Sequence, residues 1–225
     1  METQASATVE NYLQVIYGLE IEGEPVISAA LARRMHVTAP TAWATVRRMT
    51  RDGLVKLDSK KAIRLTEAGL AMAEDIVRRH RLAERFLTDV LGLGWVEAHT
   101  EAHRFEHIMS PRVEERIVSI LKNPTHCPHG SPIPGSGGIV APELVPLNRL
   151  REGESGAIEF ISEELEEDLD LLGYLERGHL TPGRMLTVKE LAPSGVIIVD
   201  VGGRSVPLGL PVAEKIRVRV QETAL

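Results

Sequence analysis

Apolar positions in the N-terminal part of the chain recur with the period of an α-helix. Residues 8–22 carry apolar side chains three and four positions apart, and residues 28–35 form a second such run. A third run, residues 42–51, follows Thr38, a favourable helix N-cap, and Pro40, which is tolerated in a first turn. The pattern predicts three helices, with a tight turn between the last two.

After residue 53 the apolar positions recur at every second residue, as they do in a β-strand. Residues 54–57 and 62–65 are short alternating runs separated by a polar turn at residues 58–60. Two such runs with a short turn predict a β-hairpin. A hairpin that directly follows the second helix of a helix-turn-helix predicts a winged helix-turn-helix.

Helical spacing returns in the middle of the chain. Residues 66–90, 96–109 and 113–121 predict three further helices with little basic charge, which we interpret as a packing and dimerisation unit. Residues 123–146 are rich in proline and glycine and predict an ordered loop that passes into a linker.

Short strands dominate the C-terminal third. An acidic helix is expected at residues 163–175, and runs of this spacing predict a small β-barrel. The fold class is therefore multidomain, mainly α with β. The expected strands are residues 157–161, 185–191, 196–201, 205–208 and 216–220.

Composition excludes several classes of protein. Apolar residues make up 43% of the 225, enough for a normal core. The sequence lacks an N-terminal basic segment followed by an apolar stretch, and it lacks a run of about 18 apolar residues. A single cysteine, Cys127, fits a reducing compartment. We expect a cytoplasmic protein with no membrane partner and no organic cofactor.

Charge is unevenly distributed although the net charge is −6. Residues 26–64 hold nine Lys or Arg against two acids, whereas residues 152–176 hold ten acids and no base. The basic segment is the expected anion-binding face.

The predicted second helix of the turn motif would read DNA. Its N-terminal part would meet base edges, and basic side chains there and on the hairpin would neutralise phosphates. The alternative is a basic surface used only for protein contacts, and Trp43 could equally be a core residue. The candidate DNA-binding residues are Thr38, Pro40, Thr41, Trp43, Ala44, Arg48, Arg51, Lys60 and Lys61.

Metal-ligand side chains are concentrated in residues 97–109. On a helix of 3.6 residues per turn, the four ligand types there fall within about a 100° arc and share one face. These four residues are His99, His103, Glu106 and His107.

Two further groups add ligands. His80 and Glu84 lie one turn apart on the preceding predicted helix, whereas His126, Cys127 and His129 lie in the proline-containing loop. The loop residues could contribute metal ligands only if the loop folds back on His80 and Glu84. Mixed nitrogen and oxygen ligands favour Mn²⁺, Fe²⁺, Co²⁺, Ni²⁺ or Zn²⁺ over Ca²⁺ or Mg²⁺.

Long ordered motifs give the chain a family resemblance. The sequence resembles the metal-dependent repressors of the diphtheria toxin repressor type, and its C-terminal strands look like that family's SH3-like domain. The motifs are Y-L-Q-V-I-Y-G-L-E at Tyr12, A-P-T-A-W-A-T-V-R-R-M-T-R-D-G-L-V at Ala39, R-H-R-L-A-E-R-F-L at Arg79, E-A-H-R-F-E-H-I-M-S at Glu101 and N-P-T-H-C-P-H-G-S-P-I-P-G at Asn123.

The resemblance implies a primary regulatory site made of Asn11, His103, Glu106 and His107. Asn11 and His103 replace Met and Cys of the iron-responsive members and acidic residues of the manganese-responsive member. The soft sulfur ligands are absent, so the metal's identity does not transfer. We expect Fe²⁺ or Mn²⁺, and we expect Co²⁺, Ni²⁺ or Zn²⁺ to be able to substitute for either ion.

The resemblance also implies an ancillary site. One family version adds His99 and groups from the C-terminal domain, and another adds Cys127 and His129 with a C-terminal carboxylate. This chain has the side chains for both, with Glu167 and Asp170 as candidates for the C-terminal contribution. The full expected set is His80, Glu84, His99, Cys127, His129, Glu167 and Asp170.

These expectations describe a metal-dependent regulator of transcription, and the family resemblance favours a repressor over an activator. It would bind a palindromic operator in double-stranded DNA as a homodimer. Its expected parts are a winged helix-turn-helix (residues 1–66), a helical metal-binding and dimerisation domain (67–146) and an SH3-like domain (147–225). One alternative is a winged-helix regulator that senses a non-metal effector, with a structural His/Glu cluster. Another is an enzyme of metal-assisted hydrolysis with Glu106 as base, which leaves the basic motif unexplained.

Overall fold

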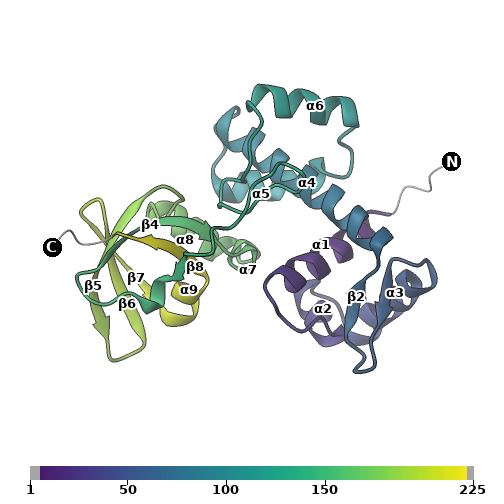
Figure 1. Cartoon of the computed structure of the whole chain (residues 1–225), viewed down its shortest axis with the longest axis horizontal. Coiled ribbons are helices and arrows are strands. Elements are labelled where there is room, and N and C mark those ends of the chain that lie inside the picture. Colours follow the sequence, from purple (N-terminus) through teal and green to yellow (C-terminus); the bar gives the residue numbers. More distant parts are fainter. Residues whose placement is uncertain (1–5, 222–225) are drawn as a thin grey trace. The chain divides into compact units, whose positions relative to one another are not determined.

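A computed structural model describes residues 6–221 (Figure 1). The chain divides into two compact units, with the boundary between Arg79 and His80. Each unit has its own core. Among the described residues, no helix combines the length and the apolar character that a membrane span requires.

The first unit is a winged helix-turn-helix, as the sequence predicted. Thr38 caps the third helix by accepting a hydrogen bond from the Thr41 amide at 3.4 Å, and Pro40 lies in its first turn. Leu13, Ile16 and Met49 are fully buried in the core. The elements are α1 (Ala7–Ile21), α2 (Ser28–Arg34), α3 (Ala39–Arg51), β1 (Val55–Leu57), β2 (Ile63–Leu65) and the first half of α4 (Glu67–Asp89).

The second unit begins with the rest of α4, followed by α5 (Trp95–Phe105) and α6 (Pro111–Ile120). The helix expected at residues 96–109 ends earlier, and residues 106–108 form a turn. Pro111 disfavours helical conformation at the residue before it, so the chain must leave one helix and start another here. Ser110 caps α6.

The predicted loop at residues 123–146 is packed onto its surroundings. Ile133 is almost fully buried with the helices, and its amide donates to the Thr125 carbonyl at 2.8 Å. The Ile161 amide donates to the carbonyl of His129 at 2.9 Å. The loop is therefore hydrogen-bonded to the last residue of strand β4 (Ser155–Ile161) in the β domain.

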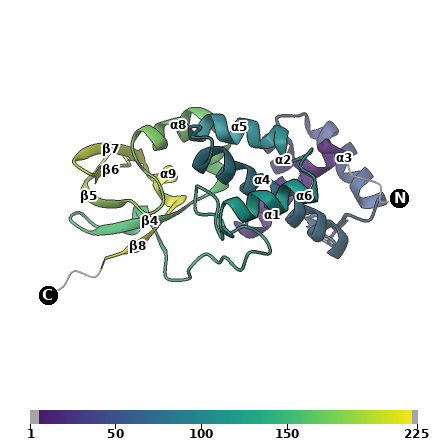
Figure 2. The same ribbon diagram turned by 90° about the horizontal axis from the view of Figure 1, so that it is seen from above.

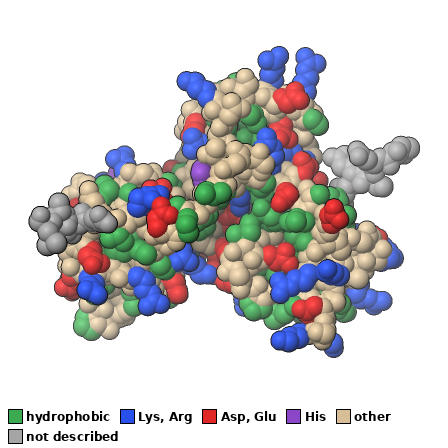
Figure 3. Space-filling view, viewed as in Figure 1, with side chains coloured by type: hydrophobic (Ala, Val, Ile, Leu, Met, Phe, Trp, Pro, Cys, Tyr) green, Lys and Arg blue, Asp and Glu red, His purple; other side chains and the backbone are tan. Residues whose placement is uncertain are grey.

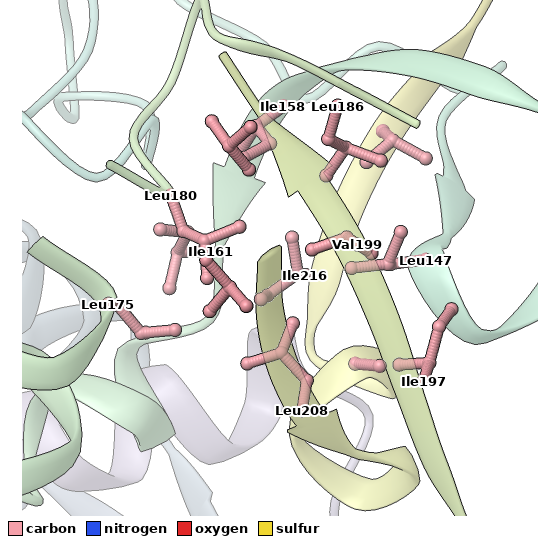
Figure 4. Close-up of a cluster of buried hydrophobic side chains, with 14 of the residues drawn as sticks. Leu147, Ile158, Ile161, Leu175, Leu180, Leu186, Ile197, Val199, Leu208 and Ile216 are labelled. Carbon is pink, nitrogen blue, oxygen red and sulfur yellow. The ribbon is translucent and has the colours of Figure 1, made fainter. Parts of the chain in front are cut away.

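The C-terminal part is an antiparallel six-stranded sheet in the order β3-β8-β4-β5-β6-β7. Irregularities at 158/160 and 188/190 fit the bending that bulges give a sheet. Its core contains a cluster of buried apolar side chains (Figure 4). The strands are β3 (Val145–Pro146), β4 (Ser155–Ile161), β5 (Met185–Ala192), β6 (Val196–Val201), β7 (Arg204–Gly209) and β8 (Ile216–Val220).

Helices of this part differ from the sequence expectation. The single acidic helix is instead α7 (Glu163–Glu166) and α8 (Leu169–Arg177). Asp168 separates them because its carboxylate accepts from the Leu171 amide at 3.0 Å and caps α8. A short 3₁₀ turn, η1 (Leu147–Arg149), and α9 (Leu210–Glu214) were not predicted.

Helices α5 and α8 lie side by side (Figure 2). The Trp95 amide at the start of α5 donates to Glu176 Oε1 at 2.9 Å, and the Trp95 ring is buried in the core of the β domain. The helical segment and the β domain are thus packed together within the second unit.

Candidate metal centres and nucleic-acid interface

Helix α4 places His80 and Glu84 one turn apart on a buried face. Residues four apart on a helix are neighbours, and His80 Nε2 lies 3.2 Å from Glu84 Oε1. Both side chains are buried. A buried imidazole and a buried carboxylate therefore share one side of this helix.

Helix α5 brings His99 and His103 to the same place, also one turn apart. His99 Nδ1 donates to Glu84 Oε1 at 2.9 Å. The ring of His103 is 4.6 Å from that of His80 and 4.7 Å from that of His99, centroid to centroid, and the third pair is 5.3 Å apart. Three imidazoles thus form a triangle between α4 and α5.

The turn after α5 adds Glu106 and His107. Glu106 is fully buried and its Oε2 contacts His80 Nδ1. Its Oε1 lies 3.6 Å from His103 Nδ1 and 3.4 Å from His107 Nε2. The single helical face expected for these residues is wrong in detail, because the helix ends at Phe105. The turn nevertheless directs both imidazoles to the same carboxylate.

Cys127 and His129 lie on a tight loop that does fold back on Glu84. The Cys127 amide donates to the Ser131 carbonyl at 2.8 Å, which closes the loop. His129 Nδ1 lies 3.6 Å from Glu84 Oε2 and 4.0 Å from Cys127 Sγ. His126 instead bonds to its neighbour Thr125 and to the carbonyl of Ile139, outside this group.

The C-terminal domain contributes Glu166, which sequence reasoning did not single out. Its Oε1 lies 3.3 Å from His129 Nδ1, and its Oε2 lies 4.0 Å from His99 Nδ1. Glu167 and Asp170, the residues expected here, are exposed instead. Helix α7 ends at Glu166, so the following residues turn outward. Nothing in the acidic run distinguishes Glu166 from its neighbours.

Within the described part of the second unit, three groups of potential ligands have donor atoms within 4.8 Å of one another. Glu84 belongs to two of them. The groups are His80 with His99 and His103, Glu84 with Cys127 and His129, and Glu84 with His99 and Glu166.

Burial and charge act in opposite directions on these groups. Burial alone would lower the pKa of His80, but the carboxylates of Glu84 and Glu106 outweigh it and raise that pKa well above its ordinary value. His129 shows the same balance, with Glu166 and Glu84 raising its pKa. Without a metal, these imidazoles therefore carry protons that neutralise the buried carboxylates.

The pKa values of the two buried carboxylates, Glu84 and Glu106, are lowered. Burial raises the pKa of Glu84, but His80 and His129 outweigh it and hold that pKa well below its ordinary value. For Glu106, hydrogen bonds from His103 and His80 overcome burial and lower the pKa to about 2. Ionised carboxylates beside imidazoles are ready ligands once the imidazole protons leave.

The residues present fit a divalent transition metal. Within the described part of the chain, His129 Nε2, Glu84 Oε2 and Glu166 Oε1 are buried and make no hydrogen bond. Buried polar atoms normally have a hydrogen-bond partner, and an absent ion is one explanation when they do not. Imidazole, carboxylate and thiolate donors suit Mn²⁺, Fe²⁺ and Zn²⁺ better than Mg²⁺ or Ca²⁺.

Asn11 lies on α1 in the first unit and is half-buried. Its Oδ1 is buried and makes no hydrogen bond to the described residues. Its joining of His103, Glu106 and His107 in a primary site stays a prediction.

Arg81 fixes the surroundings of these groups. This buried guanidinium donates from Nε to Glu163 Oε1 at 2.8 Å and from Nη1 to the carbonyl of Pro132. It therefore joins α4, the loop and the β domain at one point. The sequence held no signal for this contact, because nothing local pairs residue 81 with residue 163.

The candidate DNA-reading surface is solvent-exposed. Helix α3 buries Ala42, Val46 and Met49 and leaves its other face open. Trp43 is 38% exposed, so it belongs to the open face and not to the core. The exposed candidates are Thr38, Pro40, Thr41, Trp43, Ala44, Arg48, Arg51, Lys60 and Lys61.

The wing is stabilised by Asp58. Its Oδ1 accepts from the amides of Lys60 at 2.8 Å and Ala62 at 2.9 Å, and these backbone bonds lower its pKa. The turn presents Lys60 and Lys61 to solvent. Lys and Arg side chains gather on this part of the molecule in the space-filling view (Figure 3).

These features define a winged-helix protein with a buried, multi-ligand metal site. Comparisons with known proteins specify it further. Three family models match: the iron-dependent repressor N-terminal DNA-binding domain at residues 4–63, the iron-dependent repressor metal-binding and dimerisation domain at residues 66–135, and the FeoA domain at residues 145–220. The chain belongs to the iron-dependent repressor family, which includes the diphtheria toxin repressor.

Full-length relatives support this assignment. The iron-dependent repressor IdeR of Mycobacterium tuberculosis is 41% identical over 94% of this chain and 96% of its own. The diphtheria toxin repressor of Corynebacterium glutamicum is 35% identical over 96% and 97%. A solved manganese-dependent transcriptional repressor in complex with manganese is 35% identical, covers 95% of this chain and 100% of its own, and has a TM-score of 0.79.

Proposed function

We propose that this protein is a metal-activated transcriptional repressor of metal-ion homeostasis. It binds a palindromic operator as a homodimer, and Fe²⁺ or Mn²⁺ is the activating ion. One observation carries the proposal: a chain with an exposed recognition helix also holds a buried cluster of imidazoles and carboxylates around Glu84 and Glu106. Relatives described as iron- and manganese-dependent repressors support the choice of metal.

The primary site would be formed by Asn11, His103, Glu106 and His107. A bound divalent ion supplies the positive charge that these oxygen and nitrogen donors share. Asn11 belongs to the DNA-binding unit and the other three to the second unit. A ligand set drawn from both units favours one arrangement of the recognition helices over the others.

The ancillary site would be formed by Glu84, Cys127, His129 and Glu166. These residues come from α4, the loop and α7, so they hold the β domain against the helical segment. Their role in the proposal is to stabilise the second unit, in which His103 and Glu106 are positioned.

The chain would comprise the DNA-binding domain (residues 1–66), the metal-binding and dimerisation domain (67–146) and the β domain (147–225). Residues 1–5 of the DNA-binding domain and 222–225 of the β domain lie outside the described part. Its site of action is the cytoplasm, because its target is chromosomal DNA. The proposed function involves no catalysis. Glu106, the base of the hydrolysis alternative, has a pKa of about 2 and is a poor base near neutral pH.

Metal-dependent operator binding tests the proposal. Fluorescence anisotropy on a palindromic promoter fragment from a metal-transport gene would be recorded with Mn²⁺, with anaerobic Fe²⁺ and with chelator. We expect metal to raise affinity by roughly 5- to 150-fold, as a coupling of about 1 to 3 kcal/mol gives. Asn11→Ala and His107→Ala should lose this gain, whereas His179→Asn, at an exposed histidine of the β domain, should keep it. Equal affinity in metal and chelator would favour the non-metal effector instead.

A further inference from the structure

Arg47 lies on the exposed face of α3 and carries an unpaired guanidinium. Among residues 6–221 its side chain forms no ion pair and no hydrogen bond, whereas Arg51 pairs with Asp52 at 3.2 Å. A guanidinium without an internal partner has all its N–H donors available to DNA. We propose that Arg47 reads a guanine in the operator, and that a thymine next to this guanine packs on Trp43. The inference rests on the proposed function, because it names bases that the repressor would recognise.

The exposed face of α3 has a centre and two flanks. The buried side chains of this helix are those of Ala42, Val46 and Met49. At about 100° per residue, Ala44 lies almost opposite them, and Arg47 and Arg48 lie about 50° to either side of the line opposite the core. The two arginines therefore occupy different flanks, although they are neighbours in the sequence.

The flank that holds Arg48 is suited to phosphate. Thr41 is exposed on this flank two turns earlier, and its hydroxyl lies 2.8 Å from that of Thr38 at the start of the helix. Hydroxyl groups, guanidinium groups and helix N-termini are common donors to DNA phosphates. These contacts fix the position of the helix but carry no sequence information.

The flank that holds Arg47 is suited to base edges. Trp43 lies one turn earlier and is 38% exposed. An indole ring cannot neutralise a phosphate, but its apolar surface can pack on a thymine methyl group. Side chains on a helix lean toward its N-terminus, so the Arg47 guanidinium is directed over the turn that contains Trp43. Arginine at a base edge most often donates to both O6 and N7 of guanine, so this flank fits a guanine with an adjacent thymine.

The middle of the exposed face lets α3 approach the bases closely. Ala44 is exposed there and has no side-chain atom beyond its methyl group. The helix also contains no acidic residue between Ala39 and Arg51, so no carboxylate on α3 competes with DNA for the guanidinium of Arg47. A long side chain beside a small one can therefore extend to the floor of the major groove.

Base analogues test the inference on the full-length protein. The sequence preferred by the Mn²⁺-loaded parent would be selected from random DNA, and each guanine would then be replaced by 7-deazaguanine, which lacks the N7 acceptor. We expect one replacement in each half-site to weaken the parent and to leave Arg47→Ala unaffected. Exchange of that G·C pair for A·T should cost the parent roughly 5- to 150-fold in affinity and should cost Arg47→Ala much less.

Conservative and neighbouring variants separate base reading from charge. Arg47→Lys keeps the positive charge but lacks the planar pair of donors, so it should keep the salt dependence and lose the guanine preference. Arg48→Ala is the matched control, and it should weaken all sequences alike while keeping the sensitivity to 7-deazaguanine. Replacing the adjacent thymine by deoxyuridine removes only a methyl group, which should weaken the parent and spare Trp43→Ala.

Two results would overturn the role of Arg47. One is a set of 7-deazaguanine effects that are equal in the parent and in Arg47→Ala at every position. The other is an Arg47→Ala protein that weakens uniformly on all sequences while its salt slope falls by about 1, as expected for a lost phosphate contact. Either result would leave metal activation intact. If Arg47 discriminates guanine as expected but Mn²⁺ and chelator give equal affinity, base reading stands and the proposed metal dependence falls.

Discussion

His99 Nδ1 lies 2.9 Å from Glu84 Oε1, and this hydrogen bond joins α5 to α4 inside the second unit. The other oxygen of Glu84 faces His129 of the loop at 3.6 Å. One buried carboxylate thus meets imidazoles from two directions. Its replacement should affect every group of ligands around it.

Glu84→Gln should destabilise the metal-free protein by about 1 to 3 kcal/mol, because buried imidazoles lose the charge that accepts their protons. Chemical denaturation in chelator measures this change. Glu167→Gln removes an exposed carboxylate nearby and should alter the free energy of unfolding by less than about 0.5 kcal/mol. Equal effects of the two substitutions would contradict the central position of Glu84.

Glu166→Gln should weaken metal binding at the ancillary site, since Glu166 Oε1 lies 3.3 Å from His129 Nδ1. Loss of a ligand should cost at least about tenfold in affinity. Titration calorimetry with Mn²⁺ would measure it. Glu167→Gln and Asp170→Asn should bind as the parent does, and a loss confined to those two variants would restore the sequence-based assignment.

Stability of the metal-free protein should decline at both ends of the pH range. Glu106, with its pKa lowered from 4.5 to about 2, contributes stability above its unfolded value that disappears as the pH falls toward 2. His80 and His129, whose pKa values are raised, contribute stability below 6.5 that is lost as the pH rises through their folded values.

Thermal melting in chelator from about pH 2 to about pH 9 would measure this dependence. His80→Gln should flatten the alkaline side of the curve, whereas His179→Asn should not. A metal-free protein that becomes more stable from neutral to alkaline pH would contradict the charge balance proposed for the cluster.

Arg48→Ala should weaken operator binding and random-sequence binding alike, because Arg48 is an exposed cation on α3. The slope of log affinity against log salt concentration should fall by about 1, the value expected for one lost phosphate contact. Anisotropy titrations at several salt concentrations give this slope. An unchanged slope would remove Arg48 from the phosphate contacts.

Trp43→Ala should change sequence preference more than overall affinity. Trp43 is 38% exposed on the open face of α3, where an aromatic ring can pack on a thymine methyl group. Competition among operators with single base-pair changes measures the preference. Stability should change little, and a large loss of it would show that Trp43 acts in the core.

Local signals made most helices predictable. Thr38 with Pro40, and Ser110 with Pro111, are caps whose effect depends only on neighbouring residues. The division of the acidic helix into α7 and α8 was not predictable, because Asp168 stands in a run of similar acids and caps only once the chain has turned there.

The candidate metal site was also predictable only where it depends on local sequence. The spacing of His80 with Glu84, and of His99 with His103, is visible in the sequence. Which imidazole meets which carboxylate depends on how α4 packs against α5 and on where the loop lies, and neither is a local property. Glu166 was missed for this reason, since its burial comes from the fold of α7 against the loop.

The contacts of Arg81 couple the unfolding of the helical segment to that of the β domain. Its guanidinium is buried between the Pro132 carbonyl and Glu163, so detaching the β domain would leave a charge without its partner in the interior. Residues 80–221 should therefore melt in one cooperative transition in a calorimeter, and the helical segment and the β domain should exchange their slowest amide protons at the same rate.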